Sequence, residues 1–147
     1  MAIGKKTITA VESVLVLAFV GTLATGITLH LDHHGMVKVA HKTLETVHYC
    51  LGFTMIILAL IHAGVKWKFL AGLKKRYPLF VVDTYALAFF LLATFGTGLV
   101  KLLVHVRGLG RWHYWLGVVM SVLVVYHLMV GLPFLWRNIK NRFAPSK

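Results

Sequence analysis

Four of the nine histidines in this chain have a spacing suited to metal ligands. His48 and His62 are 14 residues apart, and so are His113 and His127. In an α-helix this separation is close to a whole number of turns, so both members of a pair lie on one face, roughly 21 Å apart along the axis. Ligands of a single metal ion lie about 2 Å from it. Each pair therefore predicts two separate sites at different levels of one helix.

The two pairs belong to a segment that occurs twice. Residues 48–70 and 113–135 align with a shift of 65, and ten of the 23 aligned positions are identical. These positions are His48/His113, Tyr49/Tyr114, Leu51/Leu116, Gly52/Gly117, Met55/Met120, Leu58/Leu123, His62/His127, Val65/Val130, Phe69/Phe134 and Leu70/Leu135. Two parallel copies in one bundle would bring His48 opposite His113 (the outer pair) and His62 opposite His127 (the inner pair).

Two imidazoles that face each other at one level are suited to the two axial positions of a haem iron. We therefore predict that the outer pair ligates one haem iron and that the inner pair ligates a second. A ligating imidazole needs a partner for its other ring N–H, and a backbone carbonyl one turn back, such as that of Leu44 or Leu109, is available for this. A zinc site or a proton relay is the rival interpretation. Zinc would need ligands that converge on one point, and we expect no acidic or cysteine partner at these depths.

Glycines at matched positions would leave room for a macrocycle beside its ligands. Gly52 and Gly117 lie one turn beyond the outer pair and are the predicted cofactor-contact residues. Gly131 likewise lies four residues after His127. The corresponding position after His62 is Lys66, and a glycine, Gly64, lies two residues before it. The inner level is therefore expected to be the less symmetric one. Close packing of membrane helices is the alternative explanation for these glycines.

The elements that hold these sites are expected to be membrane-spanning helices. The chain of 147 residues is 59% hydrophobic, its mean hydropathy is +0.79, and its uncharged runs are long enough to cross a bilayer. Because lipid cannot satisfy backbone groups, each span should be helical. We predict an all-α membrane protein with a single domain over residues 1–147. Its four transmembrane helices are placed at about 12–31, 44–66, 83–106 and 111–137.

The order of these helices predicts an up-down bundle. Pro78 is expected to interrupt helical structure between the second helix and the third. For residues 13–31 a cleaved signal peptide is the rival interpretation. The first and third helices also match weakly with a shift of 72, which aligns Thr25 with Thr97, Gly26 with Gly98 and His33 with His105. The whole chain thus looks like a duplicated two-helix hairpin.

Charge predicts the orientation of the bundle. Sixteen Lys and Arg residues face only four acidic ones, giving a formal charge of +12. The basic residues flank apolar runs, so lipid headgroups explain them better than nucleic acid does. Eleven of the sixteen lie in the N-terminal segment, the middle connector and the C-terminal tail, which predicts that both termini are cytoplasmic.

The single cysteine, Cys50, excludes a disulfide within the chain and a c-type haem attachment site.

The remaining histidines fall on the predicted outer side: His30, His33, His34, His41 and His105. They could line a quinone pocket, bond haem propionates, bind a third cofactor, or serve only as interfacial polar residues. Propionates need cations or hydrogen-bond donors. The candidates are Lys38, Lys42, Arg107 and Arg111 outside, and Lys66, Lys68 and Arg137 inside. Ordinary headgroup anchoring would explain the same cations.

Two helices that each carry histidines 14 residues apart resemble the haem-bearing helix pair of quinol–cytochrome c oxidoreductase cytochrome b. The size and helix number resemble the four-helix cytochromes of the cytochrome b561 and formate dehydrogenase gamma-subunit class. The chain is also similar to the flavinylation-associated type, small bacterial and archaeal membrane cytochromes found with extracytosolic flavoproteins. That signature is H-x3-G, a second His ten residues on, and a nearby Trp, and here it is met by His48, Gly52, His62 and Trp67, then by His113, Gly117, His127 and Trp136. The two tryptophans lie five and nine residues after the His, so Trp136 is not a strict match.

This resemblance covers nearly the whole chain. It implies two haem b groups, a bacterial or archaeal cytoplasmic membrane, and electron transfer between the quinone pool and a redox subunit such as a flavoprotein, an iron–sulfur protein or a cytochrome c. Two alternatives stay open. One is a self-sufficient oxidoreductase that passes electrons between the quinone pool and a small molecule, with superoxide as a donor or a ferric chelate as an acceptor. The other is a haem-free membrane anchor for a peripheral enzyme.

Overall fold

The computed structural model describes residues 5–73, 78–104 and 106–143, and this part of the chain contains helices and no strand. The helices are α1 (Lys5–His33), α2 (His41–Leu73), α3 (Pro78–Leu103) and α4 (Leu109–Phe143). Each contains a stretch long and apolar enough to cross a membrane: Thr7–His33, His41–Lys68, Pro78–Leu103 and Leu109–Gly131. The chain is therefore a multi-pass membrane protein, as its hydropathy predicts.

Several helix ends differ from the predicted ones, some because the helix continues beyond its apolar segment and one because it ends earlier. Helix α2 runs on to Leu73, and α3 begins at Pro78 rather than after it. Proline is tolerated there because the first turn of a helix has no partner for a backbone N–H. Helix α3 ends at Leu103 instead of extending to about residue 106. Gly35 and Gly108 turn the two remaining connectors with φ angles of 72° and 82°, a backbone region that favours glycine.

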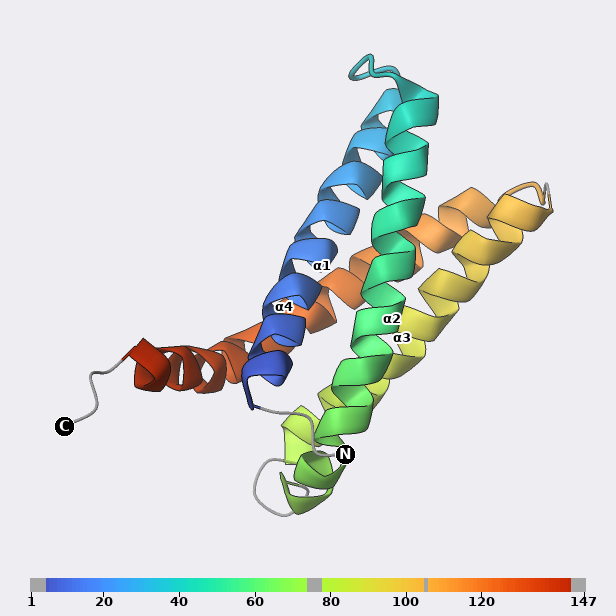
Figure 1. Cartoon of the computed structure of the whole chain (residues 1–147). Coiled ribbons are helices and arrows are strands. Elements are labelled where there is room, and N and C mark those ends of the chain that lie inside the picture. Colours follow the sequence, from blue (N-terminus) through green and yellow to red (C-terminus); the bar gives the residue numbers. More distant parts are fainter. Residues whose placement is uncertain (1–4, 74–77, 105, 144–147) are drawn as a thin grey trace.

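Figure 1 shows two antiparallel hairpins, α1 with α2 and α3 with α4, joined at one end of the bundle. Helices α2 and α4 both start at the end that carries the connectors 34–40 and 104–108, so they run in the same general direction. The closest packing is within each hairpin, while α1 against α4 and α2 against α3 touch less. Within the described ranges, no Cα atoms of α2 and α4 come within 8 Å of each other. The two histidine-bearing helices, α2 and α4, are thus diagonally opposite in the bundle, and their side chains extend into the space between them.

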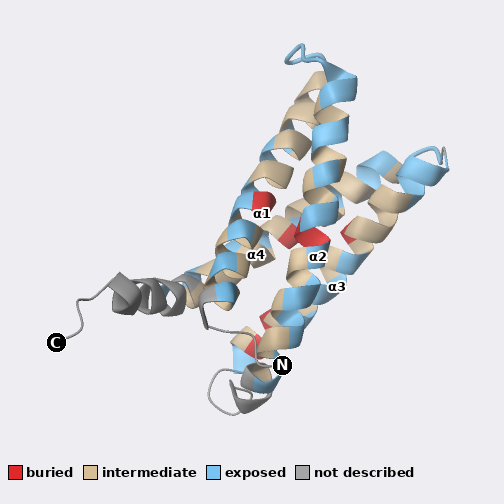
Figure 2. Cartoon of the chain, in the orientation of Figure 1, coloured by how far each residue is buried: buried red, intermediate tan, exposed pale blue. Residues whose placement is uncertain are grey.

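Buried residues lie mainly near the middle of the bundle, with a second buried patch where α3 begins, at Val81 and Asp83 (Figure 2). Ala18 and Phe19 of α1 pack near the middle with Met55 of α2 and Met120 of α4. The two methionines lie seven residues after the outer pair and seven before the inner pair, so they form a layer between the two histidine levels. Large apolar side chains such as Leu17 are exposed on the outer surface, which suits contact with lipid.

Candidate functional site

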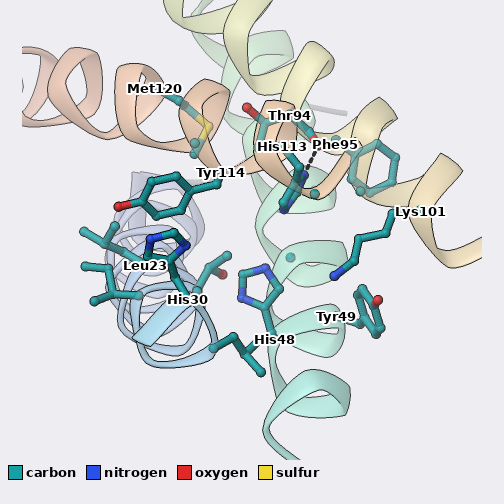
Figure 3. A pocket seen from close by; sticks show the side chains of 18 of the residues that line it. Leu23, His30, His48, Tyr49, Thr94, Phe95, Lys101, His113, Tyr114 and Met120 are labelled. Atoms are coloured by element: carbon teal, nitrogen blue, oxygen red, sulfur yellow. Dashed lines mark hydrogen bonds between the residues drawn. The ribbon is translucent and has the colours of Figure 1, made fainter. Parts of the chain in front are cut away.

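The outer pair meets across the gap between α2 and α4. The ring centroids of His48 and His113 are 6.2 Å apart and the ring planes are nearly perpendicular, at 86° (Figure 3). A metal ion bound by two imidazoles from opposite sides, about 2 Å from each nitrogen, would hold the ring centroids roughly 6 Å apart. The spacing of the outer pair therefore matches two ligands of one metal ion.

Hydrogen bonding fixes the tautomer of His113. Its Nδ1 lies 2.9 Å from the carbonyl oxygen of Thr94 and 3.2 Å from Oγ1 of Thr97. A carbonyl oxygen only accepts, so Nδ1 carries the hydrogen and donates it. The lone pair is then on Nε2, which is the form of imidazole that binds a metal.

His48 reaches the same state through Thr25, whose Oγ1 lies 2.9 Å from His48 Nδ1. The Thr25 hydroxyl donates its own hydrogen to the Gly21 carbonyl at 2.8 Å, so it accepts from His48. The carbonyls of Leu44 and Leu109, which the sequence offers as candidates, do not fill this role. The partners come from the neighbouring helices α1 and α3, because the rings point out of their own helices and into the bundle.

Glycines of those neighbouring helices admit the two rings. A Cβ atom on Gly98 would lie 2.9 Å from His113 Cε1, and one on Gly26 would lie 3.1 Å from His48 Cε1. Either distance is too short for an ordinary carbon–carbon contact. The weak sequence match between the first and third helices contains both glycines and the adjacent threonines Thr25 and Thr97. This Thr-Gly pair is the signal that links each flanking helix to its histidine.

The predicted contact glycines, by contrast, leave open space. A Cβ on Gly52 would meet nothing within 4 Å, and one on Gly117 would only touch the Thr94 methyl group at 3.9 Å. Both residues line a cavity of about 1080 Å³ that contains the outer pair. A Cβ atom on Gly64 or on Gly131 would also meet nothing within 4 Å, and neither residue lines that cavity.

The cavity is built from all four helices. Phe19, Met55 and Met120 of the central packing layer line it, and it continues to the end of the bundle that carries the short connectors. Its volume is at the upper end of the range of ordinary ligand and cofactor sites, roughly 300–1000 Å³. The cavity thus offers both room for a large planar group and two free nitrogen ligands facing each other.

Two cations line this cavity. Arg111 belongs to the predicted set, whereas Lys101 is not part of that set. Figure 3 shows the Lys101 side chain extending toward the space beside His48. Its Nζ lies 3.9 Å from Glu45 Oε1, and Glu45 also accepts a hydrogen bond of 2.9 Å from the Tyr49 hydroxyl. Lys38, Lys42 and Arg107 are not among the lining residues.

The other histidines gather at the same end. His30 stacks on Tyr114 with ring centroids 3.8 Å apart, and His34 contacts His30 edge-on at 4.5 Å. His41 forms an ion pair or hydrogen bond of 2.7 Å with Asp32 in the connector region. Among the described residues, no group of three or more His, Cys, Asp or Glu side chains is arranged to hold a metal ion. His105 lies outside the described residues.

The inner pair has acidic partners, so the prediction that none lies at these depths is wrong. Oδ2 of Asp83, on α3, lies 3.1 Å from His127 Nδ1. Oε1 of Glu12, on α1, lies 3.8 Å from His62 Nδ1 and 2.7 Å from Lys66 Nζ. Each inner histidine therefore faces a carboxylate from its hairpin partner helix.

A carboxylate beside Nδ1 is a common way to orient a ligating histidine, but among the described residues no ring contact joins His62 to His127, unlike His48 and His113 of the outer pair. Within the described part of the chain, His62 Nδ1 and Asp83 Oδ1 are buried and have no hydrogen-bond partner. The space differs from that of the outer level. A hollow of about 40 Å³ lies beside His62, and Phe80 stacks on the His127 ring with centroids 4.9 Å apart.

The other predicted inner residues are less informative. Lys68 is exposed and Trp67 is 61% exposed, as residues near a membrane surface often are. The side chains of Arg137 and Trp136 lie outside the described residues.

Comparisons with models of protein families, with characterised proteins and with solved structures found no match to this chain.

Proposed function

We propose that this chain is a dihaem b-type cytochrome that carries electrons across a membrane. The outer pair, His48 and His113, would hold one haem, and the inner pair, His62 and His127, a second. Haem iron with two imidazole ligands supplies reversible one-electron transfer when bound. The rest of the chain positions these four ligands and separates them from lipid.

One observation carries the proposal: the facing arrangement of the outer pair. The two rings are 6.2 Å apart, and both expose Nε2 because Nδ1 is engaged by Thr25 on one side and Thr94 on the other. This arrangement occurs inside a cavity of about 1080 Å³ within a membrane protein. Packing alone would not require both rings to bond a neighbouring helix through Nδ1 and leave Nε2 available in a cavity of this size.

The surrounding residues have distinct roles in this proposal. Thr25 and the Thr94 carbonyl accept the Nδ1 hydrogens and hold each ring in the ligating tautomer. Gly26 and Gly98 admit the rings, and the layer around Met55 excludes water between the two levels. Lys101 and Arg111 line the cavity, where they would bind the anionic propionates.

The proposal includes an orientation and partners. The excess of Lys and Arg at the termini and in the middle connector favours a bacterial or archaeal cytoplasmic membrane with both termini inside. In that orientation the outer pair lies near the extracytosolic face and the inner pair near the cytosol. Quinone or quinol would exchange electrons on one side and a redox protein on the other. The matched threonine–glycine–histidine contacts of the two hairpins support their origin by duplication.

The proposal is tested by counting haem in the purified full chain. A pyridine haemochrome assay should give two haem b per chain, and the reduced-minus-oxidised spectrum should be that of a b-type cytochrome. Replacing His48 with Ala should leave one haem. Cys50→Ala is the control on the same helix, because Cys50 is exposed and does not line the cavity, and it should keep two. A wild-type chain without haem would refute the proposal and favour the anchor subunit.

A second function is favoured by the cationic lining of the outer cavity. Lys101 and Arg111 at this end would attract a small anion such as superoxide or a ferric chelate, so that the chain could act without a protein partner. Reduction of the purified, haem-loaded protein by superoxide, measured with and without superoxide dismutase, separates this function from that of a complex subunit. Copurification with a redox subunit would favour the first proposal.

A further inference from the structure

The cavity that contains the outer pair is apolar at one end and polar at the other. Its inner end is lined by Phe19, Met55 and Met120 of the central packing layer. Its outer end reaches the short connectors and is lined by histidines and by Arg111. A charged group at the apolar end would lose its hydration without gaining a partner. A ligand of this cavity that carries charge along one edge should therefore turn that edge toward the short connectors.

His30 lies one helical turn beyond the level of the outer pair. It follows Gly26, which packs against the His48 ring, by four residues, so it is roughly 6 Å nearer the short connectors. Its ring stacks on Tyr114, with the centroids 3.8 Å apart and the ring planes at 10°. In the described part of the chain, neither nitrogen of this ring has a hydrogen-bond partner. The stack thus holds an imidazole with an unused N–H at the polar end of the cavity.

The charges around the cavity differ between the two sides of His48. In Figure 3 the His30–Tyr114 stack and the Lys101 side chain lie on opposite sides of His48. On the Lys101 side, Glu45 Oε1 lies 3.9 Å from Lys101 Nζ, so a carboxylate already offsets the charge of that lysine. Glu45 is also the one acidic residue among the described residues that line the cavity. A second carboxylate on this side would be repelled by the first.

The side with the stack offers hydrogen-bond donors and a positive charge. Arg111 lies three residues before Tyr114, on the same face of α4, and within the described ranges it forms no ion pair. The nearby Asp32 does not line the cavity, and its carboxylate bonds His41 Nδ1 at 2.7 Å. A carboxylate that enters this side therefore meets N–H donors and a guanidinium, which form strong, charge-assisted hydrogen bonds with it.

We propose that His30 and Arg111 bind the propionate carboxylates of the outer haem and turn the propionate edge of that haem toward the short connectors. Haem has an apolar body with both carboxylates on one edge, which matches a cavity with one apolar and one polar end. His30 donates its ring N–H to a carboxylate oxygen, and the Arg111 guanidinium pairs with the same edge. This inference rests on the proposed function, and it narrows the propionate partners at the outer level to these two residues.

The test compares two iron porphyrins that differ only in these carboxylates: protohaem, and its dimethyl ester, in which both carboxylates are masked as neutral esters. Each is titrated into the haem-free full chain carrying His127→Ala, in which the outer pair is intact, and the spectrum of the bis-imidazole complex is followed. His30→Phe keeps a ring that can stack on Tyr114 but removes the N–H. It should weaken protohaem binding roughly tenfold, as expected for one lost hydrogen bond to a charged group, and leave the affinity for the ester unchanged. The resonance Raman band of the propionate groups should shift in the same variant, which a merely structural residue would not cause.

Lys101→Met is the comparison on the other side of His48, and it should keep the preference for protohaem over the ester. Loss of that preference in Lys101→Met but not in His30→Phe would overturn the inference, because the propionates would then point toward Lys101. If His30→Phe binds neither porphyrin, Arg111→Gln at the exposed start of α4 decides: it should reduce the preference, and an unchanged preference would overturn the inference. Equal affinity of the parent chain for the two porphyrins would also overturn it and leave the proposed function standing. A wild-type chain that binds neither porphyrin would instead overturn the proposed function.

Discussion

The outer and inner histidine pairs occupy the same positions of a repeated segment, yet their surroundings differ. The outer rings face each other at 6.2 Å inside a cavity of about 1080 Å³. The inner histidines face carboxylates, with a hollow of about 40 Å³ beside His62. The repeated helices α2 and α4 supply ligands at both levels, whereas α1 and α3 decide what each ligand meets. The character of a site is therefore set by the helices that carry no ligand.

This difference predicts how readily each level accepts a cofactor. The outer pair is preorganised, since its tautomers are fixed and the cavity is open. The inner level has suitable donors, but Phe80 stacks on His127 and the helices must separate before a macrocycle enters. Preorganisation reduces the cost of binding. The outer haem should accordingly be the more firmly held of the two.

The largest effect is expected from removing one histidine ligand, because this should abolish haem binding at one level and leave the other level intact. His127→Ala removes an inner ligand and should leave one haem per chain with the spectrum of the outer site. His113→Ala removes an outer ligand and should leave one haem with the inner spectrum. Haem content and difference spectra of the purified variants measure this. If either variant keeps two haems, or if both give the same residual spectrum, the division into two levels is incorrect.

The next test addresses the close approach at the outer level. In Gly98→Ala the new methyl group would lie 2.9 Å from His113 Cε1, so the ring must move and lose its hydrogen bonds. Such overpacking costs about 1–3 kcal/mol, and outer haem retention should fall by roughly tenfold or more. Gly96→Ala is the matched control on the same helix, because nothing lies within 4 Å of its new methyl group. Equal haem retention in the two variants would contradict the role of Gly98.

Much of this comparison could be predicted from the sequence. Four helices follow from apolar runs, because lipid leaves the backbone no other way to satisfy its hydrogen bonds. The spacing of 14 residues predicts two levels, because helical rise and twist are fixed. The residue of α1 or α3 that lies at the level of an inner histidine also follows from counting 14 residues back along the antiparallel partner helix. If His48 lies beside Thr25, then His62 should lie near residue 11, and Glu12 is there; by the same count from Thr97, His127 should meet Asp83.

The hydrogen-bond partners could not be obtained from periodicity alone. Whether a ring N–H reaches a carbonyl of its own helix or a threonine of the next depends on how the helices rotate and cross, which side-chain packing decides. The same limit applies to the glycines. Gly52 and Gly117 border the open cavity, whereas Gly26 and Gly98 lie against the rings. The alignment of the first and third helices contains Gly26 and Gly98 as candidates for close approach, but it does not say which atoms approach them.

A smaller effect distinguishes the two histidines of the outer pair from each other. His113 Nδ1 lies closest to the Thr94 carbonyl, at 2.9 Å, with the Thr97 hydroxyl at 3.2 Å, whereas His48 Nδ1 lies closest to the Thr25 hydroxyl, at 2.9 Å, with the Thr22 backbone as a further partner. Thr25→Val should therefore weaken outer haem binding by about 0.5–1.5 kcal/mol, as expected for one lost hydrogen bond. Thr97→Val should have little effect, because the carbonyl remains. Haem dissociation rates of the two variants measure the difference, and a larger effect in Thr97→Val would contradict the assignment.

The smallest effect concerns the two lysine–glutamate pairs, one at each level. Lys66 lies 2.7 Å from Glu12, whose side chain is 13% exposed, while Lys101 lies 3.9 Å from Glu45, which is 32% exposed. Exposed pairs contribute about 0–1 kcal/mol because water and salt screen them. A double-mutant cycle with Lys66→Met and Glu12→Gln should give a coupling energy near the top of that range. The same cycle with Lys101→Met and Glu45→Gln should give one near zero, both being measured by denaturation of the haem-loaded protein. A stronger coupling at the outer level than at the inner level would contradict the expectation that the shorter and less exposed Lys66–Glu12 pair is the more strongly coupled one.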